Sequence, residues 1–255
     1  MINIQTENTS EVAKTENSNQ LYGKASLSFI IARYLLRALL RGLFKIEVRG
    51  LENLPRQGGY ILAGNHLSWL DAFLMLAFAP AEPRIYFMAN RQNMEKPAWR
   101  KFFTQRIGGI IPIDQGQAGN YRAIARQVSQ ILSRGGVLGI FPEGDVAAIE
   151  TGRILPLKKG IGYFAAQTGA TIVPVAFSGT RELWLRKSVL MIVGKPVVGQ
   201  QGGREIATQL VGHTAEAILA ILPPPTLENL HQPKFLRRFF TYLFIREEVK
   251  HPVPE

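Results

Sequence analysis

YILAGNHLSWLD, residues 60–71, holds the clearest structural signal in this chain of 255 residues. Its first part, Tyr60–Gly64, is a short apolar run that predicts a buried strand, and residues 72–79 predict the first turns of a helix. His66 is therefore expected at the carboxyl end of a strand, the edge at which open α/β sheets bind their ligands. Asp71 follows five residues later, near enough for its carboxylate to fold back to the imidazole.

The spacing of His66 and Asp71 has two interpretations. In the first, the histidine exchanges a proton near neutral pH, and the carboxylate bonded to the far ring nitrogen fixes the tautomer and stabilises the imidazolium. In the second, Ser68 and Asp71 form a capping box at the start of the helix, and His66 is a structural hydrogen-bond donor. The spacing alone leaves both interpretations open.

Composition restricts the class of protein. A hydrophobic fraction of 46% is that of a folded chain, and this length is enough for an α/β domain with a sizeable core. The absence of cysteine excludes disulfides, thiolate metal ligands and a cysteine nucleophile. The four histidines, at positions 66, 213, 231 and 251, are too scattered for a cluster of ligands, so no metal site is predicted.

The charge balance predicts an anionic partner. The formal net charge is +11 and the sequence pI is about 10.1, which fits a nucleic acid, an anionic membrane or a phosphorylated substrate. Residues 1–22 do not carry this charge: they form a polar tail that is predicted to be disordered and lacks the features of a signal peptide. The cations lie instead beside leucine and phenylalanine, which argues against a nucleic acid, whose partners line a polar groove with positive charge.

Residues 23–46 predict an amphipathic, membrane-associating helix. Within Ala25–Ile46 a basic residue recurs every four positions, so these residues form one stripe on a helix: Arg33, Arg37, Arg41 and Lys45. A spanning helix is excluded, because each charge would cost about 2.5–3.5 kcal/mol near the bilayer centre. The helix either lies in the interface with its stripe against lipid phosphates, or packs on the domain with its arginines in water. The wide apolar arc favours the membrane.

Strand and helix patterns then alternate over residues 47–225. Strands are expected at Ile46–Val48, Tyr60–Ala63, Arg84–Ala89, Ile110–Ile113, Val137–Phe141, Thr171–Phe177 and Val189–Val193. Helices are expected at Leu70–Ala79, Gln92–Gln105, Gly119–Ser133, Lys158–Thr168 and Arg204–Leu222. The alternation predicts a single α/β domain with a mixed, largely parallel sheet flanked by helices. Residues 226–255 form a basic-aromatic tail, in which Lys234–Lys250 fits either a second membrane contact or a helix docked on the domain.

A second informative stretch is GGVLGIFPEG, residues 135–144, which predicts a strand that ends in a turn. Pro142 restricts the backbone there, and Gly144 permits a positive φ or the close approach of a ligand. Glu143 therefore protrudes at the carboxyl end of a strand, on the same edge as His66 if the two strands are parallel. Taken alone, Pro-Glu-Gly is an ordinary turn.

Four blocks together resemble the lysophosphatidic acid acyltransferase family of glycerolipid acyltransferases. The blocks are Asn65-His66-x4-Asp71, Phe141–Gly144, Leu155–Gly160 and Ile172–Val175, and the similarity in order and spacing covers roughly Val48–Val197. The resemblance implies transfer of a fatty acyl group from acyl-CoA or acyl carrier protein, as co-substrate, to a hydroxyl of a lipid acceptor, without a further cofactor. With the basic charge and the amphipathic helix described above, it predicts a peripheral or monotopic protein on the cytoplasmic face of an anionic membrane.

The same resemblance implies roles for individual residues. His66 is the general base that takes the proton of the acceptor hydroxyl, and Asp71 orients it. A thioester is already activated, so a positioned base suffices and no protein nucleophile is needed. Glu143 and Gly144 match the block that binds the glycerol-phosphate part of the acceptor. The implied substrate-binding residues are Asn65, Ser68, Gln115, Phe141, Pro142, Glu143, Gly144, Arg153, Lys158, Lys159 and Pro174, the last in a block associated with the acyl donor or with active-site packing.

Two departures from the family pattern concern the acceptor. Gln115 occupies the position of an arginine that helps to bind the acceptor phosphate, and Asp145-Val146-Ala147 replaces Thr-Arg-Ser. An amide or a carboxylate is a poor substitute for a guanidinium that grips phosphate with two hydrogen bonds. Either Arg153, Lys158 or Lys159 takes over, or the acceptor lacks a terminal phosphate monoester, which is the favoured expectation. The alternative is a catalytically silent lipid-binding or lipid-transfer protein on the same scaffold.

Overall fold

The computed structural model of the chain describes residues 25–57, 59–90, 109–113, 121–144, 146–147, 150–224 and 235–244. Several predictions fall on other residues and lie outside the described ranges. They are the disordered tail of residues 1–22, the helix at Gln92–Gln105, the roles of Gln115 and Asp145, and most of the basic-aromatic tail.

The described residues form one seven-stranded sheet with the order β1-β7-β6-β2-β5-β3-β4. The strands are Lys45–Arg49 (β1), Tyr60–Gly64 (β2), Ile85–Asn90 (β3), Ile110–Ile113 (β4), Val137–Ile140 (β5), Thr171–Ser178 (β6) and Ser188–Val193 (β7). Neighbouring strands are parallel except β6 and β7, which are antiparallel. The predicted fold class, an α/β domain with a mixed, largely parallel sheet, is confirmed.

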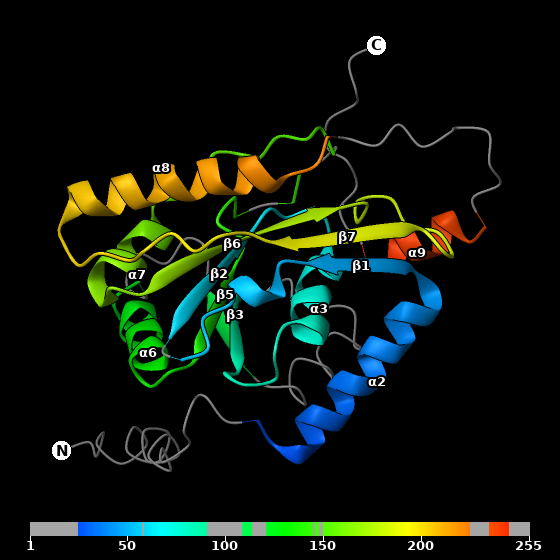
Figure 1. Ribbon diagram of the computed structural model, residues 1–255, viewed down its shortest axis with the longest axis horizontal. Helices are drawn as coiled ribbons and strands as arrows, with labels where there is room; N and C mark the ends of the chain where they lie inside the picture. The colour runs from blue at the N-terminus through cyan, green and yellow to red at the C-terminus, as the bar shows by residue number, and fades with distance from the viewer. Residues whose placement is uncertain are drawn as a thin grey trace, which may run out of the picture.

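Helices cover both faces of this sheet (Figure 1). They are α2 (Leu27–Leu43), α3 (Trp69–Phe78), α6 (Tyr121–Ser133), α7 (Gly160–Thr168), α8 (Arg204–Ile221) and α9 (Arg237–Phe244), with a short 3₁₀ turn, η2, at Leu51–Asn53. Side chains alternate along the central strand β2: Tyr60 and Leu62 join the core beneath α2, α3 and α9, and Ile61 and Ala63 join the core beneath α6, α7 and α8. Since β2 is covered on both faces, every residue in it is buried, as in other parallel sheets.

The observed strand bounds lie within one residue of the predicted ones, and those of β4 coincide. The N-terminal helix is the main correction. It ends at Leu43 because Phe44 takes an extended backbone conformation, so Lys45 and Ile46 belong to β1 and not to the helix. At its start, the side chain of Ser26 accepts a hydrogen bond from the backbone N–H of Phe29 and caps the first turn.

The orientation of α2 differs from the interpretation in which the helix packs on the domain with its arginines in water. Arg33 is buried and donates hydrogen bonds to the carbonyls of Leu76 and Ala79, and the guanidinium groups of Arg37 and Arg41 lie over the ring of Phe78. The physical reason is the C-terminal end of α3, whose last carbonyls lack partners within the helix and attract cations. The stripe thus runs from the buried Arg33 to the exposed Arg41 and Lys45, and its contact with lipid stays a prediction.

An apolar row lies on the opposite side of α2. Its members are large, exposed hydrophobic side chains: Leu27, Ile31, Tyr34, Leu35 and Leu39. The helix thus packs Phe29 and Leu40 on the domain and also exposes a row of hydrophobic side chains, so it is apolar on more than the face that the domain covers. None of the described helices is long and apolar enough to cross a membrane.

The short helix α9 packs beside the end of α2. Phe240 and Phe244 are buried and make edge-on contacts with the ring of Phe44. The hydroxyl of Thr241 bonds both the backbone N–H and the carbonyl of Leu183. The described part of the tail is therefore docked on the domain, and it adds the exposed side chains Phe235, Leu236 and Phe239 to this side of the molecule.

Candidate active site

His66 and Asp71 meet at the carboxyl end of β2, as their spacing predicts. Nδ1 of His66 lies 3.1 Å from Oδ2 of Asp71. An ionised carboxylate only accepts hydrogen bonds, so the tautomer that fits this contact has the proton on Nδ1 and the lone pair on Nε2. The histidine side chain remains 17% exposed while Asp71 is fully buried. No hydrogen bond from the described residues engages Nε2, so this nitrogen is available to a substrate.

Asp71 also caps the helix that carries it. Its Oδ2 accepts the backbone N–H of Ser68 at 2.8 Å and that of Leu67 at 2.7 Å, and the hydroxyl of Ser68 accepts the N–H of Leu70. This is the predicted capping box at the start of α3. A single carboxylate thus begins the helix and holds the imidazole, as both interpretations require, and proton exchange by His66 stays a prediction.

The ring of His66 is also held by an aromatic stack. It lies on the ring of Phe141 at a centroid distance of 4.1 Å and an interplanar angle of 16°. Phe141 comes directly after β5, which runs parallel to β2. The predicted meeting of the His66 stretch and the Phe-Pro-Glu-Gly turn at one edge of the sheet is therefore observed.

Glu143 holds the backbone of His66. The carboxylate is 4% exposed; Oε1 accepts the backbone N–H of His66 at 2.8 Å and Oε2 accepts that of Leu155 at 2.8 Å. Burial raises the pKa of Glu143 above its ordinary value, and the two backbone donors oppose the rise. The resemblance implied contact with the acceptor, but in this structure both oxygens of Glu143 are engaged by the protein.

The turn around Glu143 is tightly constrained. Gly144 has a φ of +71°, a backbone conformation that favours glycine, and the side chain of Lys158 lies against its Cα. The backbone N–H of Lys158 donates to the carbonyl of Pro142 at 2.7 Å, and its Nζ lies 3.4 Å from the carbonyl of Gly144. Arg153, Lys158 and Lys159 are all exposed on the segment between this turn and α7.

Three other predicted residues have structural partners. Asn65 pairs with the backbone of Phe177: its Nδ2 donates to the carbonyl and its Oδ1 accepts the N–H. Ser68 is buried as the helix cap. Pro174 is buried in the middle of β6, in register with Ala63 of β2, and not at the carboxyl edge. Substrate roles for these residues remain predictions.

Sequence reasoning missed the segment that follows β6. Thr180 donates to Oδ1 of Asp71 at 2.6 Å, and Arg181 donates to the carbonyl of Leu67 at 3.3 Å. Glu150 accepts hydrogen bonds from the hydroxyl of Ser178 and the N–H of Gly179. No local pattern marks these residues, because their partners lie far away along the chain.

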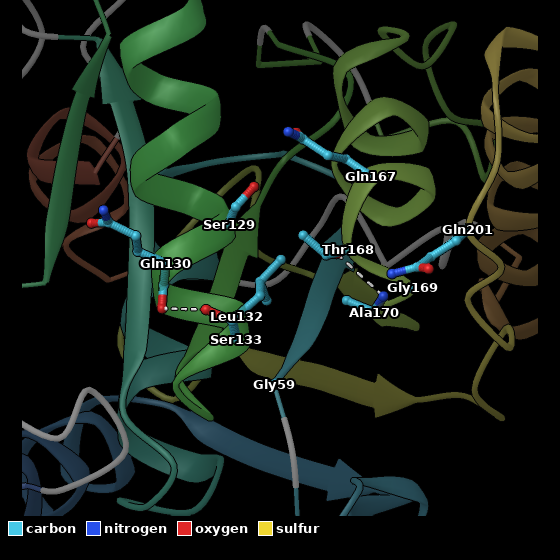
Figure 2. A pocket seen from close by; sticks show the side chains of 10 residues that line it. All are labelled: Gly59, Ser129, Gln130, Leu132, Ser133, Gln167, Thr168, Gly169, Ala170 and Gln201. Carbon is cyan, nitrogen blue, oxygen red and sulfur yellow. Dashed lines mark hydrogen bonds between the residues drawn. The ribbon is translucent and has the colours of Figure 1, made fainter.

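A hollow of about 570 Å³ lies at the opposite edge of the sheet. Figure 2 shows it between the end of α6, the end of α7 and the start of β2. Its lining is uncharged: Gly59, Ser129, Gln130, Leu132, Ser133, Gln167, Thr168, Gly169, Ala170 and Gln201. It precedes β2 and β6, whereas His66 follows β2, so the sheet separates it from the residues described above.

The Acyltransferase family model matches residues 45–178, which include β1 to β6 and the whole His66–Asp71–Glu143 network. The chain belongs to the Acyltransferase family. Membership confirms the family resemblance drawn from the four sequence blocks.

Curated relatives and a solved structure agree with the family. A 1-acyl-sn-glycerol-3-phosphate acyltransferase of Bacillus subtilis is 28% identical over 60% of this chain and 73% of its own length. A human 1-acyl-sn-glycerol-3-phosphate acyltransferase alpha is 29% identical over 56% of this chain, which spans about half (49%) of that protein. The crystal structure of the acyltransferase PlsC from Thermotoga maritima matches with a TM-score of 0.58 at 21% identity, covering 76% of this chain and 79% of that one. This last likeness shows a shared fold.

Proposed function

We propose that this protein transfers a fatty acyl group from an acyl thioester, acyl-CoA or acyl carrier protein, to a hydroxyl of a lysophospholipid or related lipid acceptor. The observation that carries the proposal is the His66–Asp71 pair at the carboxyl edge of the sheet, with Nδ1 bonded to the buried carboxylate and an exposed edge of the ring. The names of the curated relatives support the reaction class.

In the proposed reaction, Nε2 of His66 takes the proton of the acceptor hydroxyl as the oxygen attacks the thioester carbonyl. The tetrahedral intermediate then collapses, the C–S bond breaks, and the thiolate leaves with the proton that His66 returns. Asp71 stabilises the imidazolium between these steps. Proton transfer of this kind is worth about 10²–10⁴ in rate.

The acceptor is proposed to lack a terminal phosphate monoester. Val146 and Ala147 stand where the family pattern has arginine and serine, and Ala147 is buried with its N–H bonded to the carbonyl of His66 at 2.8 Å. The loop next to His66 thus has apolar side chains at the two positions where the family pattern has arginine and serine. A lysophospholipid with a head group, a glycolipid or another lipid alcohol fits this loop better than a bare phosphate.

The test is release of free CoA from one radiolabelled acyl-CoA against a panel of lyso-lipids and lipid alcohols that includes lysophosphatidic acid. His66→Ala should lower acceptor-dependent release by about 10²–10⁴, while His213→Ala, an exposed histidine on α8, should leave it unchanged. Undiminished turnover by His66→Ala would refute the assignment of the base. Lipid binding without CoA release from any acceptor would favour the silent lipid-binding alternative.

Association with a membrane surface is part of the proposal. The exposed apolar row of α2 and the exposed side chains of Phe235, Leu236 and Phe239 supply the hydrophobic surface for it, and α9 packs beside the end of α2 through Phe44 and Phe240. Apolar surface of this extent is typical of an interaction site, and a bilayer is the partner that holds the lipid substrates. The proposed location is the cytoplasmic face, which suits a chain without cysteine.

Vesicle flotation tests this association. Ile31→Glu combined with Leu35→Glu should weaken binding at least tenfold, because burying each of these side chains is worth roughly 1.5–3 kcal/mol. Leu219→Glu, at an exposed leucine on α8, is the matched control and should bind like the wild type. If the wild type and both variants float equally well, the exposed row of α2 does not bind the membrane.

A further inference from the structure

Residues 178–181 connect the two loops of the candidate site. On one side, Ser178 and Gly179 hold the carboxylate of Glu150, on the segment that follows the Glu143 turn. On the other side, Thr180 and Arg181 contact Asp71 and Leu67, in the loop of the base. This segment touches the machinery of the proposed reaction without belonging to any of the sequence blocks that carried the family resemblance.

Thr180 makes the most specific of these contacts. It is fully buried, and its hydroxyl lies 2.6 Å from Oδ1 of Asp71, a residue 109 positions away. The other oxygen of that carboxylate, Oδ2, faces Nδ1 of His66 and the N–H groups of Leu67 and Ser68. Within the described ranges, Thr180 is the donor that the structure records for Oδ1.

Bonds to both oxygens determine the rotation of a carboxylate about its Cβ–Cγ bond. The carboxylate is planar, so both oxygens turn together about this bond, and the three partners at Oδ2 and the one at Oδ1 hold the same rotation. Thr180 is the partner on the Oδ1 side, and its hydroxyl narrows the range of rotation that remains, because hydrogen bonds to an ionised group are the strong ones. Without a hydrogen bond to Oδ1, the buried carboxylate of Asp71 would also lose part of the interaction energy that offsets the cost of burying its charge.

We propose that Thr180 is a positioning residue, which locks the carboxylate of Asp71 so that it holds His66 in the tautomer with Nδ1 protonated and Nε2 free. Its kinetic consequence rests on the proposed function, because it concerns the same base. Because Thr180 is fully buried and acts through Asp71, its effect is expected on the chemical step and not on binding.

The experiment compares Thr180→Val with Thr180→Ser and with Thr214→Val. Valine keeps the branched shape and removes the hydroxyl, and serine restores the hydroxyl. Thr214 is an equally buried threonine on α8, whose hydroxyl donates to the carbonyl of Leu210 at 2.6 Å, so it controls for the loss of a buried hydrogen bond elsewhere. Circular dichroism checks the fold of each variant.

Thr180→Val should lower kcat about tenfold to a hundredfold, the scale of one hydrogen bond to a charged group, with KM for both substrates unchanged. Thr180→Ser should recover most of kcat, and Thr214→Val should retain it. A second readout needs no turnover: the ¹⁵N shifts of the imidazole, assigned with His66→Ala, should show one tautomer in the wild type and a mixture in Thr180→Val.

Wild-type kcat and an unmixed tautomer in Thr180→Val would overturn the inference. So would a loss of kcat that Thr180→Ser does not repair or that Thr214→Val shares. If Thr180→Val does not fold, Thr180→Ala against Thr180→Ser decides, because both lack the methyl group and differ by the hydroxyl alone. If the wild type transfers no acyl group to any acceptor, the proposed function fails, and the tautomer measurement still tests Thr180.

Discussion

At the carboxyl edge of the sheet, hydrogen bonds from His66, Leu67, Ser68 and Thr180 converge on one buried carboxylate, while at the amino edge a hollow of about 570 Å³ is lined by uncharged side chains. The amino edge contains an open volume, whereas the carboxyl edge contains a buried carboxylate that is fixed by hydrogen bonds. Burying a charge is costly unless it is paired and bonded. Such a network is therefore a better indication of a chemical site than open volume is.

Of the substitutions that test this difference between the two edges, Glu143→Gln is expected to lower kcat the most. Glutamine has one carbonyl oxygen for the two backbone N–H groups of His66 and Leu155, so one of these donors loses its partner. The backbone of the base should shift, and kcat should fall about tenfold to a hundredfold, since small misplacements of reacting groups carry such costs. Steady-state kinetics on the preferred acceptor measures it. Glu216→Gln, on the surface of α8, is the control, and equal activity of both variants would contradict the role of Glu143.

A smaller effect concerns stability as a function of pH. Because burial raises the pKa of Glu143 above its ordinary value of 4.5, the folded protein keeps a proton there over a pH range in which the unfolded chain has lost it. The free energy of unfolding should therefore fall as pH rises through that range, and be unaffected by this group below it. Urea denaturation across the range should show a fall in the wild type that Glu143→Gln lacks. Parallel curves for the two proteins would mean that this carboxyl titrates normally.

At the amino edge no effect is expected. Replacing Gln167 and Gln201 together by alanine removes two polar side chains from the lining of the hollow, far from the His66 ring. Neither kcat nor the KM of donor or acceptor should change by more than about twofold, because exposed polar substitutions cost little. A clear rise in the KM of the donor or of the acceptor would contradict this expectation, because it would show that the hollow contributes to substrate binding.

Much of the carboxyl edge was predictable because its signals are local. Apolar runs placed the strands, and His66 and Asp71 are five positions apart, a separation that a single strand-to-helix turn closes. The capping box came from the same few residues. The parallel pairing of β2 with β5, which brings Glu143 to His66, needed only the α/β alternation.

The remaining features depend on contacts between distant residues. Thr180 meets Asp71 across 109 positions, and a threonine after a strand carries no sign of its partner. The sequence Pro-Glu-Gly likewise does not indicate that Glu143 accepts hydrogen bonds from the backbone N–H groups of His66 and Leu155. For α2, periodicity identified the residues that share a face, but not which face the domain would cover. The end of α3 decided that, because its free carbonyls bind Arg33.

The exposed apolar row of α2 also affects how the protein would respond to salt. With Arg33 bonded to carbonyls and Arg37 and Arg41 stacked on Phe78, the row that faces outward contains leucine, isoleucine and tyrosine. Attraction through such a row does not decay with the Debye length. If α2 holds the protein on a bilayer, as proposed, its attachment should persist on zwitterionic vesicles at high ionic strength, and the head groups of the lipids would then matter as substrates more than as an anchor.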